Sequence, residues 1–95
     1  MNQRFKNKVV LVSGTSSGIG EKVAITFAEQ GAKVILSSRN ADLNENLVRK
    51  IKKSGGKALF IKADFSKPSD VQNVIKEGVK HFGSLDIAVN NAGIE

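Results

Sequence analysis

The sequence contains no cysteine, no tryptophan, no tyrosine and only one proline among its 95 residues. Without cysteine the chain can form neither a disulfide framework nor a thiolate metal site, and we expect no metal site. The longest aliphatic run, residues 9–12, is far shorter than the roughly 20 residues that span a bilayer. These absences favour a soluble protein of a reducing compartment, with the cytoplasm as its location and no membrane partner.

The net charge of +6 raises the question of a nucleic-acid partner. Proteins that bind nucleic acids usually gather basic residues on one face or interleave them with aromatic residues. Here most lysines are scattered, and the one basic cluster, residues 49–57, contains no aromatic residue. We therefore expect no nucleic-acid partner. The cluster fits a solvated helix face, and electrostatic steering of a small anionic ligand is the alternative.

A short apolar strand, a turn and an amphipathic helix recur along the chain. The expected strands are residues 8–13, 33–38, 57–63 and 85–89. Each intervening helix has apolar residues at i, i+4 and i+8, which predicts one buried stripe per helix. The stripes are Ile19, Val23 and Phe27; Leu43, Leu47 and Ile51; and Val71, Ile75 and Val79, the last flanked by Val74 and Phe82. Glycines at positions 31, 55–56 and 83 are expected to end these helices.

Strands that are apolar throughout and alternate with helices predict an α/β fold. In such a fold the strands form a parallel sheet with helices on both faces. The apolar fraction of 40% and the charged fraction of 25% are those of an ordinary globular protein. We expect a single domain over residues 1–95, with a doubly wound sheet of about four strands and three helices.

A glycine-rich loop, SGTSSGIG at residues 13–20, joins the first strand to the first helix. Gly14 permits a tight turn, and Gly18 and Gly20 let a backbone approach a pyrophosphate and bring the helix close to the strand. The helix N-terminus then offers free N–H groups and a partial positive charge to phosphates. The spacing differs from G-x-G-x-x-G and from the P-loop. A turn with a purely structural role is the alternative.

Three motifs together resemble the short-chain dehydrogenase/reductase family. They are Gly14-x-x-x-Gly18-x-Gly20, Asp64 after the third strand, and Asn90-Asn91-Ala92-Gly93 after the fourth. The resemblance covers all 95 residues and implies a Rossmann-like sheet whose strand order begins 3-2-1-4. One departure is Ser13, where the family usually has threonine, although a hydroxyl is kept.

The resemblance also implies the residues that bind a dinucleotide cofactor. The loop residues Gly14, Thr15, Ser16, Ser17, Gly18, Ile19 and Gly20 would surround its pyrophosphate and adenosine ribose, with the hydroxyls of residues 15–17 as contacts. Asp64 would bind the adenine amino group, and Phe65 would pack beside the base; a turn or helix-approach aspartate is the alternative for Asp64. Asn91, Ala92 and Gly93 would line the adenosine ribose, and Asn90 would help lock the central strands together.

The end of the second strand bears on which dinucleotide is bound. A carboxylate there accepts hydrogen bonds from the ribose 2′-OH and repels a 2′-phosphate. This chain has Ser38 and Arg39 instead, and the planar fork of arginine suits a phosphate. We therefore expect NADP(H) to be preferred over NAD(H), as the resemblance also implies. Ser17 weakens this preference because many NADP-binding members have a basic residue there; a solvated Arg39 is the alternative.

The family's chemistry is hydride transfer between the nicotinamide and a carbonyl or alcohol, for which it uses a tyrosine, a lysine, a serine and an asparagine. All four would lie beyond Glu95, and His81 fits a solvated residue better than a catalytic one. We thus expect no catalytic residue here and no turnover by this chain alone. The hypotheses are the N-terminal part of a short-chain oxidoreductase, or a non-catalytic nucleotide-binding module or truncated remnant. The strand at 85–89 would be an exposed edge, open to self-association.

Overall fold

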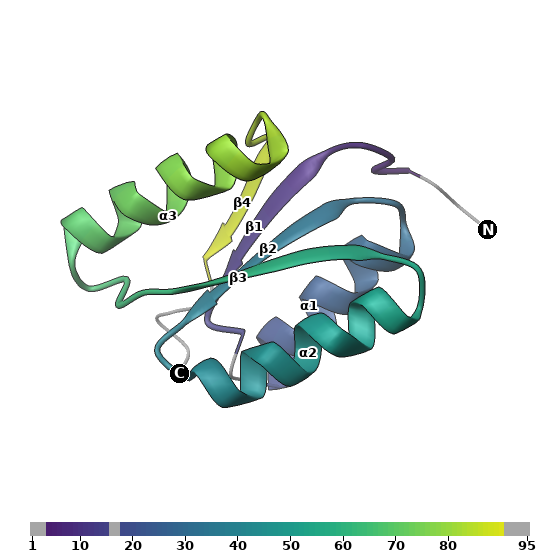
Figure 1. The fold of residues 1–95 in the computed structure, drawn as a ribbon, viewed down its shortest axis with the longest axis horizontal. Helices are drawn as coiled ribbons and strands as arrows, with labels where there is room; N and C mark the ends of the chain where they lie inside the picture. The colour runs from purple at the N-terminus through teal and green to yellow at the C-terminus, as the bar shows by residue number, and fades with distance from the viewer. Residues whose placement is uncertain (1–3, 16–17, 91–95) are drawn as a thin grey trace.

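The structure, a computed structural model, describes residues 4–15 and 18–90. Strands alternate with helices along the chain, as the sequence predicts. The elements are β1 (Val9–Ser13), α1 (Gly18–Glu29), β2 (Lys33–Ser38), α2 (Ala41–Lys53), β3 (Lys57–Lys62), α3 (Pro68–Phe82) and β4 (Ile87–Asn90). All pairings between the four strands are parallel, and their order is β3-β2-β1-β4 (Figure 1). The predicted fold class and strand order are confirmed.

The helices cover both faces of the sheet, with α1 and α2 on one face and α3 on the other (Figure 1). Because successive strand residues point to opposite faces, β1 and β2 supply apolar side chains to two cores. The core under α1 and α2 includes Val10, Val12, Val34 and Leu36. The core under α3 includes Val9, Leu11 and Ile35. This two-sided burial explains why these strands are apolar throughout.

The predicted stripes of the helices are partly wrong. Four of their members are exposed: Ile19 by 55%, Leu43 by 53%, Ile75 by 39% and Val79 by 38%. α1 buries Gly20 and Ala24, and α3 buries Val74 and Gly78. α2 buries Asn44 as well as the predicted Leu47 and Ile51. Glycines are buried in α1 and α3, where the helix backbone lies close to its neighbours. A Cβ added at Gly78 would be 2.4 Å from Cδ1 of Ile35.

Glycine ends the helices at the predicted positions. Gly31, Gly55 and Gly83 have φ values of 91°, 92° and 90°. This left-handed conformation is disfavoured for residues with a Cβ. At the end of α3, the Gly83 N–H donates to the Val79 carbonyl over 2.7 Å. These ends set where β2, β3 and β4 begin.

Side chains fasten β4 to β1 at both ends. At the start, the Val9 N–H donates to Oδ2 of Asp86 over 2.8 Å, and the Asp86 N–H donates to the Val9 carbonyl over 2.9 Å. At the end, the Ser13 hydroxyl donates to Oδ1 of Asn90 over 2.9 Å. The predicted link between the central strands through Asn90 is therefore present, and it uses the hydroxyl that serine shares with threonine.

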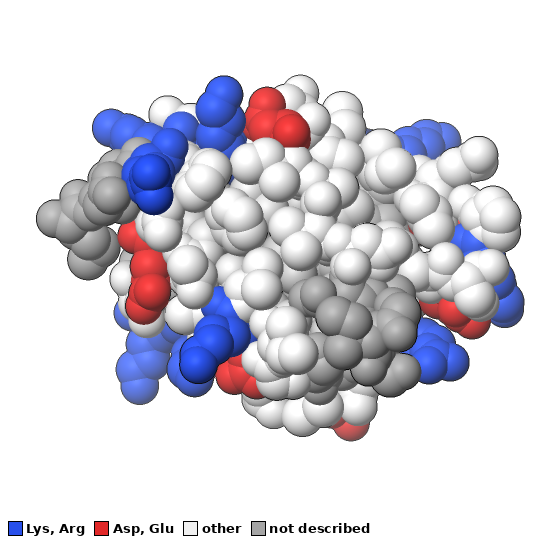
Figure 2. All heavy atoms as spheres, turned by 180° about the vertical axis from the view of Figure 1, so that it is seen from behind, with Lys and Arg blue, Asp and Glu red and all other residues white. Residues whose placement is uncertain are grey.

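Charged side chains on the face in Figure 2 lie mainly around its periphery. Within the described part of the chain, the one ion pair joins Lys50 and Glu21 at 3.8 Å, and both side chains are largely exposed. Exposed pairs of this kind contribute little to stability. None of the helices in the described residues is long and apolar enough to cross a membrane.

Gly20→Ala is expected to lower the free energy of unfolding by about 1–3 kcal/mol, the usual range for overpacking. A Cβ at Gly20 would be 2.3 Å from the carbonyl oxygen of Gly14. Gly18→Ala is the matched control, since a Cβ there meets nothing within 4 Å. Urea denaturation measures both; an equally stable Gly20→Ala variant would contradict the packing of α1 described here.

Candidate functional site

The carboxyl ends of β1, β2 and β3 meet at one edge of the sheet, where open parallel sheets bind their ligands. Gly14 and Thr15 follow β1, Arg39 follows β2, and Asp64 and Phe65 follow β3. The predicted binding residues that the structure describes therefore share this edge. Ser16, Ser17, Asn91, Ala92 and Gly93 lie outside the described residues.

The glycine-rich loop turns tightly and brings α1 to this edge. Gly14 has a φ of 72°, and its N–H donates to the Ser37 carbonyl of β2 over 2.8 Å. Gly20 lets α1 approach the Gly14 carbonyl, which no larger residue could do at that distance. Gly18, in contrast, is exposed, and a Cβ there would have open space around it. The fold does not require glycine at 18, so close approach of a ligand remains a reason for it.

A cavity of about 150 Å³ lies between the three strand ends. It is lined by Gly14, Ser38, Arg39, Ala63, Asp64, Phe65 and Ser66. Predicted binding residues from the ends of β1, β2 and β3 thus line one cavity. Arg39 is exposed and has no ion-pair partner among the residues that the structure describes, so its guanidinium is available to an anion.

Asp64 is held in its ionised form by its neighbours. Its Oδ1 accepts from the Ser66 hydroxyl over 2.7 Å and from the Ser66 N–H over 2.9 Å. These two bonds are the main reason why the pKa of Asp64 lies below its ordinary value of 3.8. Desolvation acts in the opposite direction and raises the pKa, whereas the charges of Arg39 and Lys67 lower it further. The Asp64 N–H donates to Oδ2 of Asp70 in α3 over 2.9 Å, which fixes the loop.

Asn44 belongs to this edge and was missed by the sequence analysis. It lies in the first turns of α2, is fully buried, and forms hydrogen bonds with Thr15, Ser38 and Asn40. Thr15 is also buried, at 3% exposure, and its hydroxyl donates to Asn44. The predicted contact of Thr15 with a ligand remains a prediction.

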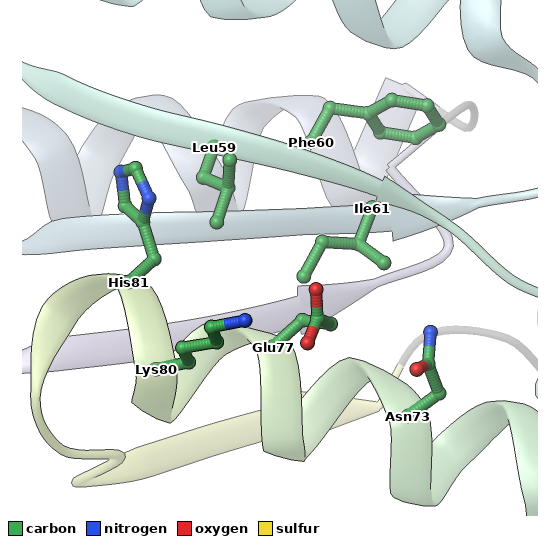
Figure 3. A pocket seen from close by; sticks show the side chains of 7 residues that line it. All are labelled: Leu59, Phe60, Ile61, Asn73, Glu77, Lys80 and His81. Carbon is green, nitrogen blue, oxygen red and sulfur yellow. The ribbon is translucent and has the colours of Figure 1, made fainter.

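A larger cavity, about 510 Å³, lies between β3 and α3 (Figure 3). It is lined by Leu59, Phe60, Ile61, Asn73, Glu77, Lys80 and His81. It lacks the glycine loop and every predicted binding residue. The His81 ring is exposed and packs edge-to-face on Phe82, with ring centroids 4.8 Å apart. No group of three or more potential metal-binding side chains occurs within residues 4–15 and 18–90.

Known proteins are similar to this chain in sequence and in fold. A family model described as short chain dehydrogenase matches residues 8–95. An uncharacterized oxidoreductase of Thermotoga maritima is 48% identical over 90 residues, and a cyclohexanol dehydrogenase of an Acinetobacter species is 40% identical over 94 residues. These matches cover 95% and 99% of this chain, but only 35% and 38% of the two relatives.

A solved structure described as a hydroxysteroid dehydrogenase from Escherichia coli superposes with a TM-score of 0.89 at 34% identity. The match covers 94% of this chain and 38% of that one. The sequence match, the strand order and the glycine loop at the carboxyl edge agree with one another. This chain therefore belongs to the short-chain dehydrogenase family.

Proposed function

We propose that this chain forms the adenosine side of an NADP(H) site in a short-chain oxidoreductase. The observation that carries the proposal is that Arg39 and Asp64, from different strand ends, line one 150 Å³ cavity beside the glycine loop. A cation and a carboxylate that line the same cavity suit a ligand that has both an anionic group and a hydrogen-bond donor. The adenosine 2′-phosphate and the adenine amino group are such a pair.

Arg39 supports NADP(H) over NAD(H). At the end of β2 the chain has the Ser38 hydroxyl and the Arg39 guanidinium. Among the described residues that line the cavity, the one carboxylate is on Asp64, which follows β3. A guanidinium binds phosphate through parallel N–H donors. Since Arg39 has no ion-pair partner among the described residues, a 2′-phosphate would not have to displace an internal one.

Asp64 supports binding of the adenine amino group. Both hydrogen bonds from Ser66 end on Oδ1 of Asp64, so Oδ2 is left as an acceptor among the residues that the structure describes. Because its pKa is lowered, the carboxyl is ionised and cannot act as a donor at neutral pH. Phe65, half-buried against the α3 core, lines the same cavity and offers an apolar wall for the base.

The bound nicotinamide would supply hydride transfer between NADP(H) and a carbonyl or alcohol. Two similar proteins are described as a cyclohexanol dehydrogenase and a hydroxysteroid dehydrogenase, which favours this substrate class. The part of the protein seen here would bind and orient the adenosine half. Because the sequence contains no tyrosine to serve as general acid or base, we expect no turnover by these 95 residues alone.

Arg39→Asp is expected to weaken NADPH binding about ten- to a hundredfold, since a charge-assisted hydrogen bond contributes about 1.5–3 kcal/mol. NADH binding should stay the same or improve. Isothermal titration of each cofactor against both variants measures the effect. Arg49→Asp is the control, because it makes the same charge change at an exposed position of α2. Equal NADPH affinity in wild type and Arg39→Asp would contradict the proposal.

Ser66→Ala is expected to raise the pKa of Asp64 toward 3.8, because both Ser66 bonds favour the carboxylate and the variant loses the one from the hydroxyl. A lowered pKa stabilises the fold fully above 3.8, and this contribution is lost as the pH falls through the folded-state value. Between pH 3.8 and the lowered pKa, the free energy of unfolding of Ser66→Ala should therefore fall less with acid than that of wild type. Carboxyl NMR titration measures the pKa, with Ser69→Ala as control; an unchanged Asp64 pKa in Ser66→Ala would refute the assignment.

A further inference from the structure

Asn44 is a polar side chain in a position that the fold otherwise fills with apolar ones. It lies on the same face of α2 as Leu47 and Ile51, and all three are buried. Asn44 itself is 0% exposed. Burying an amide without partners costs roughly 2–7 kcal/mol, so a buried asparagine must be hydrogen-bonded to be tolerated. Here the whole amide is engaged.

The amide of Asn44 forms three hydrogen bonds. Its Nδ2 donates to the Ser38 hydroxyl oxygen over 2.5 Å and to the Asn40 carbonyl over 2.6 Å. Its Oδ1 accepts from the Thr15 hydroxyl. The two N–H groups and the oxygen of the amide each have a partner, and the Ser38 oxygen also accepts from the Asn40 N–H over 3.2 Å. Such a satisfied buried network fixes one geometry.

These partners belong to two different segments, the glycine-rich loop after β1 and the end of β2 with the loop that follows it. Thr15 follows Gly14 in the glycine-rich loop, whereas Ser38 and Asn40 are the chain neighbours of Arg39 on either side. One side chain thus connects the loop after β1 to both flanks of the arginine after β2. The side chain of Asn40 in turn accepts from the Leu43 N–H over 3.2 Å and caps α2, so the network extends to the helix start.

We propose that Asn44 is a positioning residue that holds Arg39 in register with the glycine-rich loop and thereby sets the preference for a 2′-phosphorylated adenosine. This inference rests on the proposed function. The ligand's pyrophosphate and 2′-phosphate would contact the two loops that Asn44 connects. A flexible arginine loses conformational freedom on binding, and fixing its backbone in advance reduces that cost.

A purely structural role would have a different signature from a positioning role. If Asn44 only stabilises the fold, its loss lowers stability and weakens all adenosine ligands in the same proportion. If it positions Arg39, its loss weakens ligands with a 2′-phosphate more than those without one. The ratio of the two affinities therefore separates the two roles.

The test compares 2′,5′-ADP with 5′-ADP by isothermal titration against wild type, Asn44→Leu and Thr15→Val. Leucine keeps a similar volume without polar groups, and valine removes only the hydroxyl that Asn44 accepts from. We expect the preference for 2′,5′-ADP to fall roughly two- to tenfold in Asn44→Leu, the scale of one or two hydrogen bonds. Thr15→Val should change it in the same direction by less, and it serves as the test if Asn44→Leu does not fold.

Asn46→Leu is the matched control, because it makes the same change at an exposed position of α2 and should leave the ratio unaltered. An unchanged ratio in both Asn44→Leu and Thr15→Val would overturn the proposal. Amide hydrogen exchange of the ligand-free chain gives a second readout: Gly14 and Thr15 should exchange faster together with Arg39 and Asn40 in Asn44→Leu.

The two readouts also separate the failure of this proposal from that of the proposed function. If wild type binds 2′,5′-ADP no better than 5′-ADP, the NADP(H) preference is wrong. Joint acceleration of exchange in the two loops would then still support Asn44 as their connection. Acceleration in one loop only, or in neither, would overturn the connection even if wild type prefers 2′,5′-ADP.

Discussion

The close approach of α1 to the end of β1 is the constraint on which the candidate site depends. Gly20 packs where a Cβ would come within 2.3 Å of the Gly14 carbonyl oxygen. This contact brings the N-terminus of α1 to the carboxyl edge of the sheet, and the positive end of a helix dipole favours an anion there. Gly20 also lies beside Thr15. The buried hydroxyl of Thr15 donates a hydrogen bond to Asn44 in α2. Through Thr15 and Asn44, this contact is connected to the ends of β1 and β2 and to the starts of α1 and α2.

Two opposite charges lie at the carboxyl edge of the sheet. The guanidinium of Arg39 and the carboxylate of Asp64 line the same cavity from neighbouring strands, and the charge of Arg39 helps to lower the pKa of Asp64. Neither is neutralised by an ion pair with another described residue. Ser66 holds the side chain of Asp64 by a hydrogen bond, and Asp70 accepts a hydrogen bond from the Asp64 backbone N–H. The site therefore keeps two opposite charges available on one cavity, an arrangement suited to a ligand with an anionic and a donor end.

Much of the fold could be predicted from the sequence because its signals are local. Apolar strand runs, glycines with positive φ and the order of motifs depend on a few neighbouring residues, and the structure confirms the strands and the helix ends. The side of each helix that faces the sheet was less predictable. Hydropathy predicts Leu43 inward, but Leu43 is 53% exposed and Asn44 is buried instead, where three hydrogen bonds satisfy its amide. Its spacing from Leu47 and Ile51 was the one available signal, since the three share a helix face.

The central claim is that the carboxyl edge binds the adenosine half of NADP(H). The most direct measurement is a titration of the ¹⁵N-labelled chain with NADP⁺, followed by amide chemical shifts. The account predicts the largest shifts at the ends of β1, β2 and β3, at Gly14, Arg39 and Asp64, and little change at Glu77 and His81 in the cavity between β3 and α3. Shifts centred on that larger cavity, or none at millimolar NADP⁺, would contradict it.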